Sequence, residues 1–278
     1  MSNGTRWLWQ VIFALLGVSR LSAQFVVTLQ PQTIRDFDAY AGKVEQQLSS
    51  RWRGAQRFLS IEDDPNAIQN VLIGEIVIRP GAPQSPVSVT NGLIHDWVGT
   101  VFIPNAKLEE VLSLLQNFNR HHEVYPAIIA SKLISIDGNS IVGSWRLERK
   151  DPLQTVVLDV PQHAKYERIA PDKWICRAYA KAISEVQNPG TPEEKILPAG
   201  KGRGYLWRLY AYWSLEARNG GVLAENRALS LSRNVPVAFT WIVKPFLQTL
   251  PRQSLAETLQ ETRSAITKST SAKDAHKM

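Results

Sequence analysis

The sequence predicts an α+β fold in which a run of antiparallel strands is closed by one long C-terminal helix. Three observations lead to this prediction. Strand-like hydrophobic patterns follow one another from residue 95 to residue 232, and residues 237 to 268 have a helical pattern. Tight turns at Asp137-Gly138 and Asn219-Gly220-Gly221 join neighbouring strands, because Asn and Gly adopt the positive φ that antiparallel hairpins need.

The composition is that of an ordinary folded protein. Of 278 residues, 44% are hydrophobic and 21% are charged, and the chain has one Cys. These values exclude collagen, coiled coils, disordered chains and disulfide scaffolds. Cys176 has no partner for an internal disulfide, and its apolar strand pattern predicts a buried small hydrophobic residue. Lys and Arg are scattered without a run of five, so the net charge of +7 does not indicate a nucleic-acid partner.

Residues 1 to 23 have the pattern of a secretory signal. Arg6 precedes an apolar stretch from Trp7 to Val18, and small residues lead to Ala23. A buried N-terminal helix and an uncleaved anchor are the alternatives. Cleavage would remove Arg6 and Arg20 and lower the net charge from +7 to +5. We therefore expect a secreted or periplasmic protein.

Residues 24 to 94 are expected to form an accessory cap, because a segment of about 70 residues buries too little surface to fold alone. A helix is expected over residues 34 to 53, with apolar residues along one face. Two strand-like runs, 71 to 78 and 87 to 94, flank a Pro-Gly segment. The aromatic residues of the cap are candidates for a lid, or for contact with a partner or a membrane: Phe37, Tyr40, Trp52 and Phe58.

Residues 95 to 268 form the expected main domain, and residues 269 to 278 an expected disordered tail. On the strand pattern of residues 173 to 187, small side chains occupy the middle of one face. They indicate either close packing against a helix or space for a ligand. The expected elements are a strand at 95–103, a helix at 107–118, strands near 128–136, 139–148, 154–160, 164–169, 173–187, 205–217 and 222–232, and the helix at 237–268.

The second hairpin admits two registers. A two-residue loop places Trp213 on one face with Asn226 and puts leucines on both faces. A three-residue loop gathers Trp207, Trp213 and most of the leucines on one face. We expect the three-residue loop, because register follows the hydrophobic pattern where one face is buried. Glu225 and Arg227 then point into that apolar face, either as an ion pair that holds the terminal helix or as a polar anchor for a ligand. A different register, or an exposed face, is the remaining alternative.

Several stretches of the main domain indicate a known superfamily. They are Trp97 to Pro104 followed by a helix, Tyr125-Pro126, Gly220 to Leu231, and Pro236 to Leu259. In this order they resemble the START-like, or SRPBCC, superfamily, nearest to its coenzyme-Q-binding and polyketide cyclase-like branch. The resemblance implies a helix-grip fold, in which a curved antiparallel sheet wraps around the C-terminal helix and encloses an apolar cavity.

From this resemblance and the apolar faces we expect an exported, non-catalytic binder or carrier of a hydrophobic small molecule, such as a lipid or an isoprenoid quinone. One alternative is a cyclase- or aromatase-like enzyme that uses Glu225 and Arg227. Another is a structural or membrane-surface protein with a filled cavity, and a transient membrane contact is also an expectation. The candidate ligand-binding residues are Trp97, Trp145, Trp207, Trp213, Glu225 and Arg227.

No catalytic residue, metal site or cofactor is predicted. His121-His122 lacks a third ligand at a familiar metal-site spacing. His95-Asp96 lacks a nucleophile in a recognisable context. The glycine-rich segment from Pro198 to Gly204 precedes a strand rather than a helix, so it indicates a mobile loop and not a phosphate site.

Overall fold

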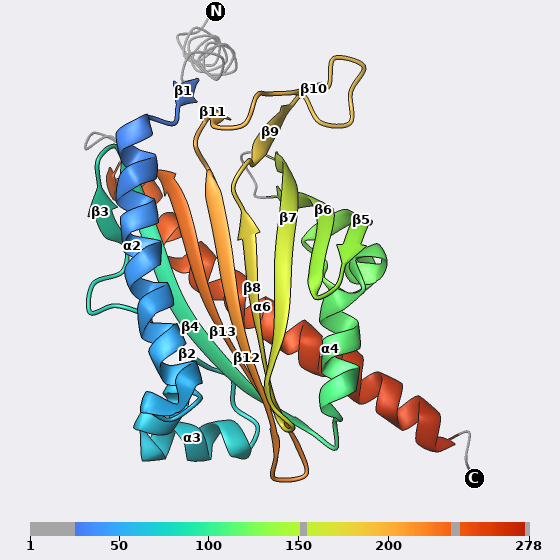
Figure 1. The fold of residues 1–278 in the computed structure, drawn as a ribbon. Helices are drawn as coiled ribbons and strands as arrows, with labels where there is room; N and C mark the ends of the chain where they lie inside the picture. The colour runs from blue at the N-terminus through green and yellow to red at the C-terminus, as the bar shows by residue number, and fades with distance from the viewer. Residues whose placement is uncertain (1–25, 151–154, 235–239, 276–278) are drawn as a thin grey trace, which may run out of the picture.

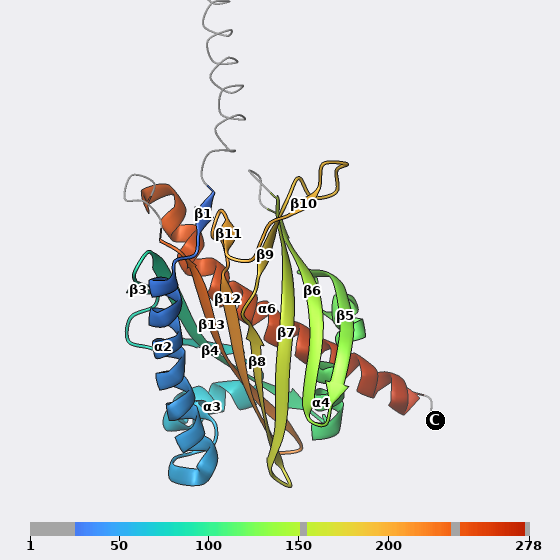
Figure 2. The same ribbon diagram turned by 45° about the horizontal axis from the view of Figure 1, so that its top comes forward.

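The computed structural model describes residues 26 to 150, 155 to 234 and 240 to 275. Helices cover both faces of one large antiparallel sheet, so the predicted α+β class is confirmed. Helix α2 (Pro31–Ser50) lies in front of the sheet and α6 (Thr240–Ala275) runs diagonally behind it (Figure 1). Figure 2 shows the same sandwich of helix, sheet and helix after a turn about the horizontal axis.

Every strand pair in the sheet is antiparallel. The main order is β5-β6-β7-β8-β12-β13-β4-β2, with β3 also on β4, and β9 and β10 continuing beyond β7. The strands are β2 (Val77–Pro80), β3 (Val87–Val89), β4 (Gly92–Pro104), β5 (Ile128–Asp137), β6 (Ser140–Lys150), β7 (Thr155–Ala170), β8 (Lys173–Ala180), β9 (Ser184–Gln187), β10 (Lys195–Ile196), β12 (Arg208–Arg218) and β13 (Gly221–Arg233). Strands β1 (Val27–Thr28) and β11 (Lys201–Gly202) form a separate pair.

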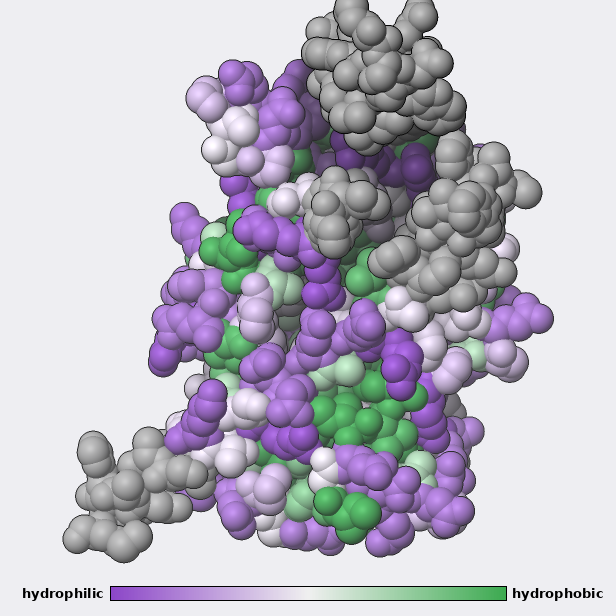
Figure 3. All heavy atoms as spheres, turned by 180° about the vertical axis from the view of Figure 1, so that it is seen from behind, coloured by the Kyte–Doolittle hydropathy of each residue, from purple (hydrophilic) through white to green (hydrophobic). Residues whose placement is uncertain are grey.

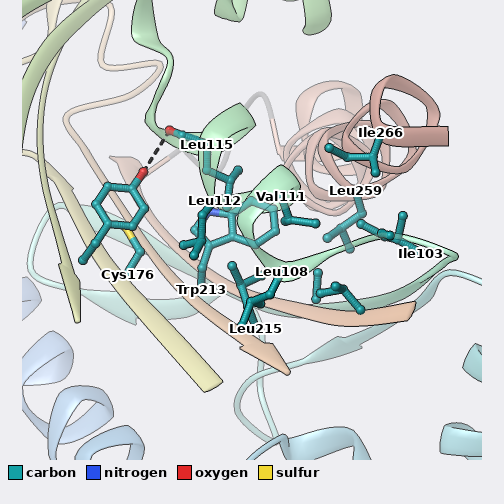
Figure 4. Close-up of a cluster of buried hydrophobic side chains, with 14 of the residues drawn as sticks. Ile103, Leu108, Val111, Leu112, Leu115, Cys176, Trp213, Leu215, Leu259 and Ile266 are labelled. Atoms are coloured by element: carbon teal, nitrogen blue, oxygen red, sulfur yellow. Dashed lines mark hydrogen bonds between the residues drawn. The ribbon is translucent and has the colours of Figure 1, made fainter. Parts of the chain in front are cut away.

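The face of the sheet that carries α6 is called the α6 face. Helix α6 packs against β4, β13 and β2, and α4 (Leu108–Gln116) covers the neighbouring strands. At Gly99 the contact is close, because a Cβ there would lie 2.5 Å from Leu259 Cδ1. Figure 4 shows Leu259 and Ile266 of α6 near α4, within one buried cluster that also contains Trp213. The short segments η3 (Phe118–Arg120) and α5 (His121–Val124) follow α4.

The opposite face, called the α2 face, is also buried. Phe37 and Trp52 are 0% and 4% exposed and Phe58 is 7% exposed, and all three pack against leucines and tyrosines of β12 and β13. Phe37, Trp52 and Phe58 are therefore core residues, and Tyr40 packs against the same cluster while partly exposed. A lid or contact role for the cap stays a prediction. Segments η1 (Arg51–Ala55) and η2 (Ser60–Asp63) and helix α3 (Pro65–Leu72) complete this layer.

The hairpin between β12 and β13 corrects the expected register. Arg218 pairs with Gly221, so the loop has the two residues Asn219 and Gly220, and Trp213 lies opposite Asn226. The expectation of a three-residue loop assumed that only one face was buried. Because α2 and α3 bury the second face, leucines on both faces are stable and the hydrophobic pattern does not select the register.

Other boundaries also differ from the expectations. Val71 belongs to α3, and only the last two residues of the expected strand 71–78 are in β2. The patterns 154–160 and 164–169 form one strand, β7, because Pro161 lies where one edge of β7 is unpaired, between its contacts with β9 and β8. The pattern 173–187 is two strands, β8 and β9.

The last expectations to compare with the structure concern the two ends of the chain and the cap. Helix α6 continues to Ala275, so most of the expected disordered tail, residues 269 to 278, is helical. The expected secretory signal, residues 1 to 23, lies outside the described residues. The cap does not stand apart from the main domain, because β2 and β3 both pair with β4.

Candidate functional site

A row of four alanines crosses the α6 face. By strand register, Ala164 on β7, Ala178 on β8, Ala211 on β12 and Ala228 on β13 lie opposite one another, and Trp97 on β4 is next. Ala178, Ala211 and Ala228 are partly exposed, although their strands lie in the middle of the sheet. Such residues reach solvent only where the covering helices leave a space. We call this row the alanine row and the accessible part of the α6 face around it the hollow.

Larger apolar side chains on the α6 face surround the alanine row. Trp97, Trp145, Leu147 and Leu209 are partly exposed, and each packs against a buried hydrophobic cluster of this layer. Trp213 belongs to the adjoining buried cluster and is 7% exposed. Three of the predicted ligand-binding residues, Trp97, Trp145 and Trp213, therefore lie on the face that bears the hollow.

The side of the hollow toward α4 is closed by dense packing. The Tyr166 hydroxyl donates to Leu115 O at 2.8 Å, which is the dashed line in Figure 4. Cys176 lies in the same cluster at 2% exposure, and burial raises the pKa of its thiol to about 12. The prediction of a buried small hydrophobic residue is confirmed for Cys176.

Two buried polar residues on this face were not among the predicted site residues. Asn226 is 4% exposed and His95 is 2% exposed. Asn226 Oδ1, His95 Nδ1 and the indole nitrogen of Trp97 are buried and have no hydrogen-bond partner among the described residues. The Asn219-Gly220 dipeptide contained the signal for Asn226, because it is a strong indicator of a two-residue hairpin loop.

Glu225 and Arg227 lie on the α2 face and not in the hollow, which corrects the expectation that they face the same side as Trp213. Glu225 is 4% exposed and caps segment η2. Its carboxylate accepts hydrogen bonds from the backbone N–H groups of Ser60 and Ile61 and from the hydroxyls of Ser60 and Thr100, at 2.9 to 3.1 Å. Glu225 therefore attaches the cap to the sheet.

Arg227 makes its ion pair with Asp96 and not with Glu225. Its Nε and Nη2 donate to the two Asp96 oxygens at 2.9 and 2.6 Å, and the Tyr40 hydroxyl donates to Asp96 at 2.6 Å. Burial lowers the pKa of Arg227, but the hydrogen bonds and charge of Asp96 outweigh burial and raise it overall. This geometry does not support the enzyme alternative that places Glu225 and Arg227 in the hollow.

Trp207 is also on the α2 side. It is 3% exposed within the buried cluster that includes Leu229 and Leu231, so it does not line the hollow. A pocket of about 610 Å³ lies on the same side, between α2 and the sheet. Glu225 and Arg227 form part of its wall, together with Lys43 and Arg51.

A second depression lies between α3, the end of β4 and α6. It has a volume of about 550 Å³, and its lining includes Leu72, Ile73, Phe102 and Arg263, none of which belongs to the alanine row. Ile73 is 78% exposed. Figure 3 shows the α6 side of the molecule, where hydrophobic residues gather in the lower part of the view among hydrophilic ones.

The predicted histidine pair is divided between core and surface. His121 is 3% exposed, and its Nδ1 accepts from the Trp145 indole N–H at 3.0 Å, while His122 is exposed beside Ser131. Within the described ranges, no cluster of three or more His, Cys, Asp or Glu residues could hold a metal ion. None of the helices described is both long and apolar enough to cross a membrane.

The topology decides the fold. Strand β4, the short helices after it, and the antiparallel strands from β5 to β13 lead to a terminal helix that packs across the β4 and β13 side of the sheet. This is the helix-grip arrangement.

Comparison with solved structures finds several similar chains. The structure is similar to a STAR-related lipid transfer protein fragment from Xanthomonas axonopodis, at 18% identity and a TM-score of 0.45, covering 69% of this chain and 98% of that chain. It is also similar to human STARD10, at 14% identity and a TM-score of 0.44, covering 77% and 83%. A third similar structure is the di-domain ARO/CYC StfQ from the steffimycin biosynthetic pathway, at 12% identity and a TM-score of 0.42, covering 64% and 52%. No protein-family model and no curated protein matches the sequence.

Proposed function

We propose that the protein binds or carries a hydrophobic small molecule in the hollow on the α6 face, without catalysing a reaction. The observation that carries the proposal is the partial exposure of Ala178, Ala211 and Ala228 on central strands of the sheet, beside the strands that α6 and α4 cover. Small side chains beneath an accessible space, with larger apolar residues around it, are typical of a small-molecule site.

The driving force would be the burial of apolar ligand surface. Each 100 Å² removed from water against Trp97, Trp145 and Leu209 contributes about 2.5 kcal/mol. By register, strands β4, β13, β12 and β8 direct no Lys, Arg, Asp or Glu toward the α6 face in their described residues. This composition favours binding over acid–base chemistry in the hollow.

Export belongs to the same proposal. The pattern of residues 1 to 23, a positive end followed by an apolar stretch and small residues, supports secretion or delivery to the periplasm. Export is tested by measuring the intact mass of the protein recovered from the culture medium or the periplasm. A mature N-terminus at Gln24 is the expected result, and an intact Met1 in the cytoplasmic fraction alone would contradict export.

The binding proposal is tested by filling the hollow. Nile red, a neutral lipophilic dye, should bind the wild-type protein, and Ala211→Phe should weaken that binding at least about 10-fold, because the ring occupies the ligand space. The free energy of unfolding should change by less than about 1 kcal/mol, since overpacking costs about 1 to 3 kcal/mol only where no space exists. Ala130→Phe, at an exposed position on β5, is the matched control and should leave binding unchanged.

Two outcomes would contradict the proposal. If the wild-type protein takes up no dye and native mass spectrometry detects no extractable lipid, the hollow does not bind ligand. If Ala211→Phe destabilises the protein by several kcal/mol without a loss of dye binding, the interior is filled by side chains, as the structural alternative requires.

A further inference from the structure

The pocket of about 610 Å³ on the α2 face, called the α2 pocket, lies on the opposite side of the sheet from the hollow. Helix α2 lines one side of it, and β4 and β13 contribute Val98 and Arg227 from the sheet. Its volume is within the range of roughly 300 to 1,000 Å³ that is usual for small-molecule sites. The α2 pocket is therefore large enough for a ligand of its own.

The residues that α2 contributes to the pocket are mostly polar. Lys43, Gln46, Gln47 and Ser50 all line it. Residues three, four and seven positions apart lie on the same side of a helix, so these four side chains share the side of α2 next to its buried stripe. Together they present hydrogen-bond donors to whatever occupies the pocket.

Cationic side chains outnumber anionic ones in the lining. The charged residues that line the α2 pocket are Lys43, Arg51, Arg227 and Glu225. The Glu225 carboxylate already accepts four hydrogen bonds from η2 and β4, so it is not available to a cationic ligand. The ion-pair partners of Arg51 and Arg227 are Asp63 and Asp96, and neither of them lines the pocket. The lining therefore favours an anionic ligand.

Two of these cations retain hydrogen-bond donors for a ligand. Lys43 is exposed and forms no ion pair with a described residue. Arg227 uses Nε and Nη2 to hold Asp96, and among the described residues its Nη1 donates only to Gln47 Oε1, at 3.4 Å. That distance is long for a hydrogen bond, which is usually about 2.9 Å, so an anionic oxygen could replace Gln47.

The pocket also has an apolar part. Leu48 and Val98 line it and are 6% and 7% exposed. An inorganic ion would leave this apolar surface and most of the volume unused. An organic anion can instead place its charged group near Lys43 and Arg227 and its apolar part against Leu48 and Val98.

We propose that the α2 pocket is a second binding site, which takes a small organic anion with a phosphate or carboxylate group on an apolar body. Lys43 and Arg227 bind the anionic group, and Leu48 and Val98 contact the apolar body. This site is independent of the hollow, because the sheet separates the two.

Isothermal titration calorimetry on the full chain at low ionic strength tests the site with 1-naphthyl phosphate, 1-naphthoate, 1-naphthol and inorganic phosphate. At least one of the two naphthyl anions should bind in one equivalent, about 10 times more tightly than 1-naphthol or inorganic phosphate, because a hydrogen bond to a charged group contributes about that factor. Added NaCl should weaken the binding. The tighter of the two anions identifies the preferred charged group.

Substitution of Lys43 locates the binding. Lys43→Gln should weaken binding of the naphthyl anion about 5- to 10-fold, and Lys43→Glu should weaken it further, because the new carboxylate repels the ligand. Both variants should fold, since Lys43 is exposed. Lys132→Gln, at an exposed position on the edge strand β5, is the matched control and should leave the affinity unchanged.

Three outcomes would overturn the inference. They are a failure of both naphthyl anions to bind, binding of 1-naphthol as tight as that of the anions, and an unchanged affinity in Lys43→Glu. A naphthyl anion that displaces Nile red would also contradict it, because the anion would then occupy the hollow. If Nile red does not bind while a naphthyl anion binds in the α2 pocket, the proposed function fails and this inference holds.

Discussion

Breaking the Arg227–Asp96 pair should destabilise the protein severely without disturbing the hollow. The two side chains are 12% and 0% exposed, and the Arg227 guanidinium donates two hydrogen bonds to the carboxylate, at 2.6 and 2.9 Å. Asp96→Leu leaves a buried cation without its carboxylate partner, and Arg227→Met leaves a buried anion whose remaining side-chain donor among the described residues is Tyr40. Each single change should cost about 3 to 5 kcal/mol.

Urea unfolding of the two single variants and of the double variant Asp96→Leu/Arg227→Met measures the coupling free energy between Asp96 and Arg227. The double variant should lose less than the sum of the single losses, because no unpaired charge is left. For a chain of this length the single changes correspond to a fall in Tm of roughly 6 to 20 °C. Nile red binding should be retained below each variant's transition, since the pair lies on the α2 face. Single losses below about 1 kcal/mol, or losses that simply add, would refute the assignment of a buried, coupled pair.

Three further predictions concern other parts of the structure. Glu225→Gln should lower the free energy of unfolding, measured in urea, by about 2 to 4 kcal/mol, because the new amide NH₂ faces groups that donate hydrogen bonds to the carboxylate. Dye binding should not change. Weaker dye binding in the folded variant would contradict the placement of Glu225 on the α2 face. Burial lowers the pKa of His121 to about 4, below the unfolded value of 6.5, so stability should fall as pH drops from about 6.5 to about 4, by about 3 kcal/mol for this residue. His121→Gln should reduce that fall and the exposed His122→Gln should not; equal acid sensitivity in both would exclude His121 as a source. Gly99→Ala should destabilise the protein by about 1 to 3 kcal/mol, because the new methyl group would contact Leu259. Gly42→Ala, in the interior of α2 with open space around it, should stabilise the protein by up to about 1 kcal/mol. If Gly42→Ala were the more destabilising change, the close contact of α6 with β4 at Gly99 would be refuted.

The order of elements in the main domain could be predicted from the sequence because local signals specify it. Gly138 adopts a positive φ in the two-residue turn between β5 and β6, and Asn219 and Gly220 do so between β12 and β13, although the first turn is Gly138-Asn139, one residue beyond the Asp137-Gly138 pair. The inner stripe of the terminal helix, which includes Leu255, Leu259 and Ile266, is buried as its helical spacing predicts.

The faces of the central strands could not be predicted in the same way. The register argument assumed one buried face, but α2 and α3 bury the second one with residues more than 100 positions away in the sequence. Once both faces are apolar, Leu215 on one side and Leu223 on the other are equally well buried, at 1% and 0% exposure. Alternation of side chains along a strand then carries little information about which face bears the site.

The same two-sided burial explains why the charged residues were misplaced. Arg227 and Glu225 were compared with each other because they are two residues apart, but their partners come from β4 and from the cap, at Asp96 and Ser60. Their hydrogen bonds on the α2 face hold the cap against the sheet. If that attachment fixes the sheet from one side, α6 and α4 do not have to fill the other side completely to keep the fold together. The alanine row can then remain partly exposed above a rigid sheet, which is the condition for a preformed site that binds an apolar molecule without a large ordering cost.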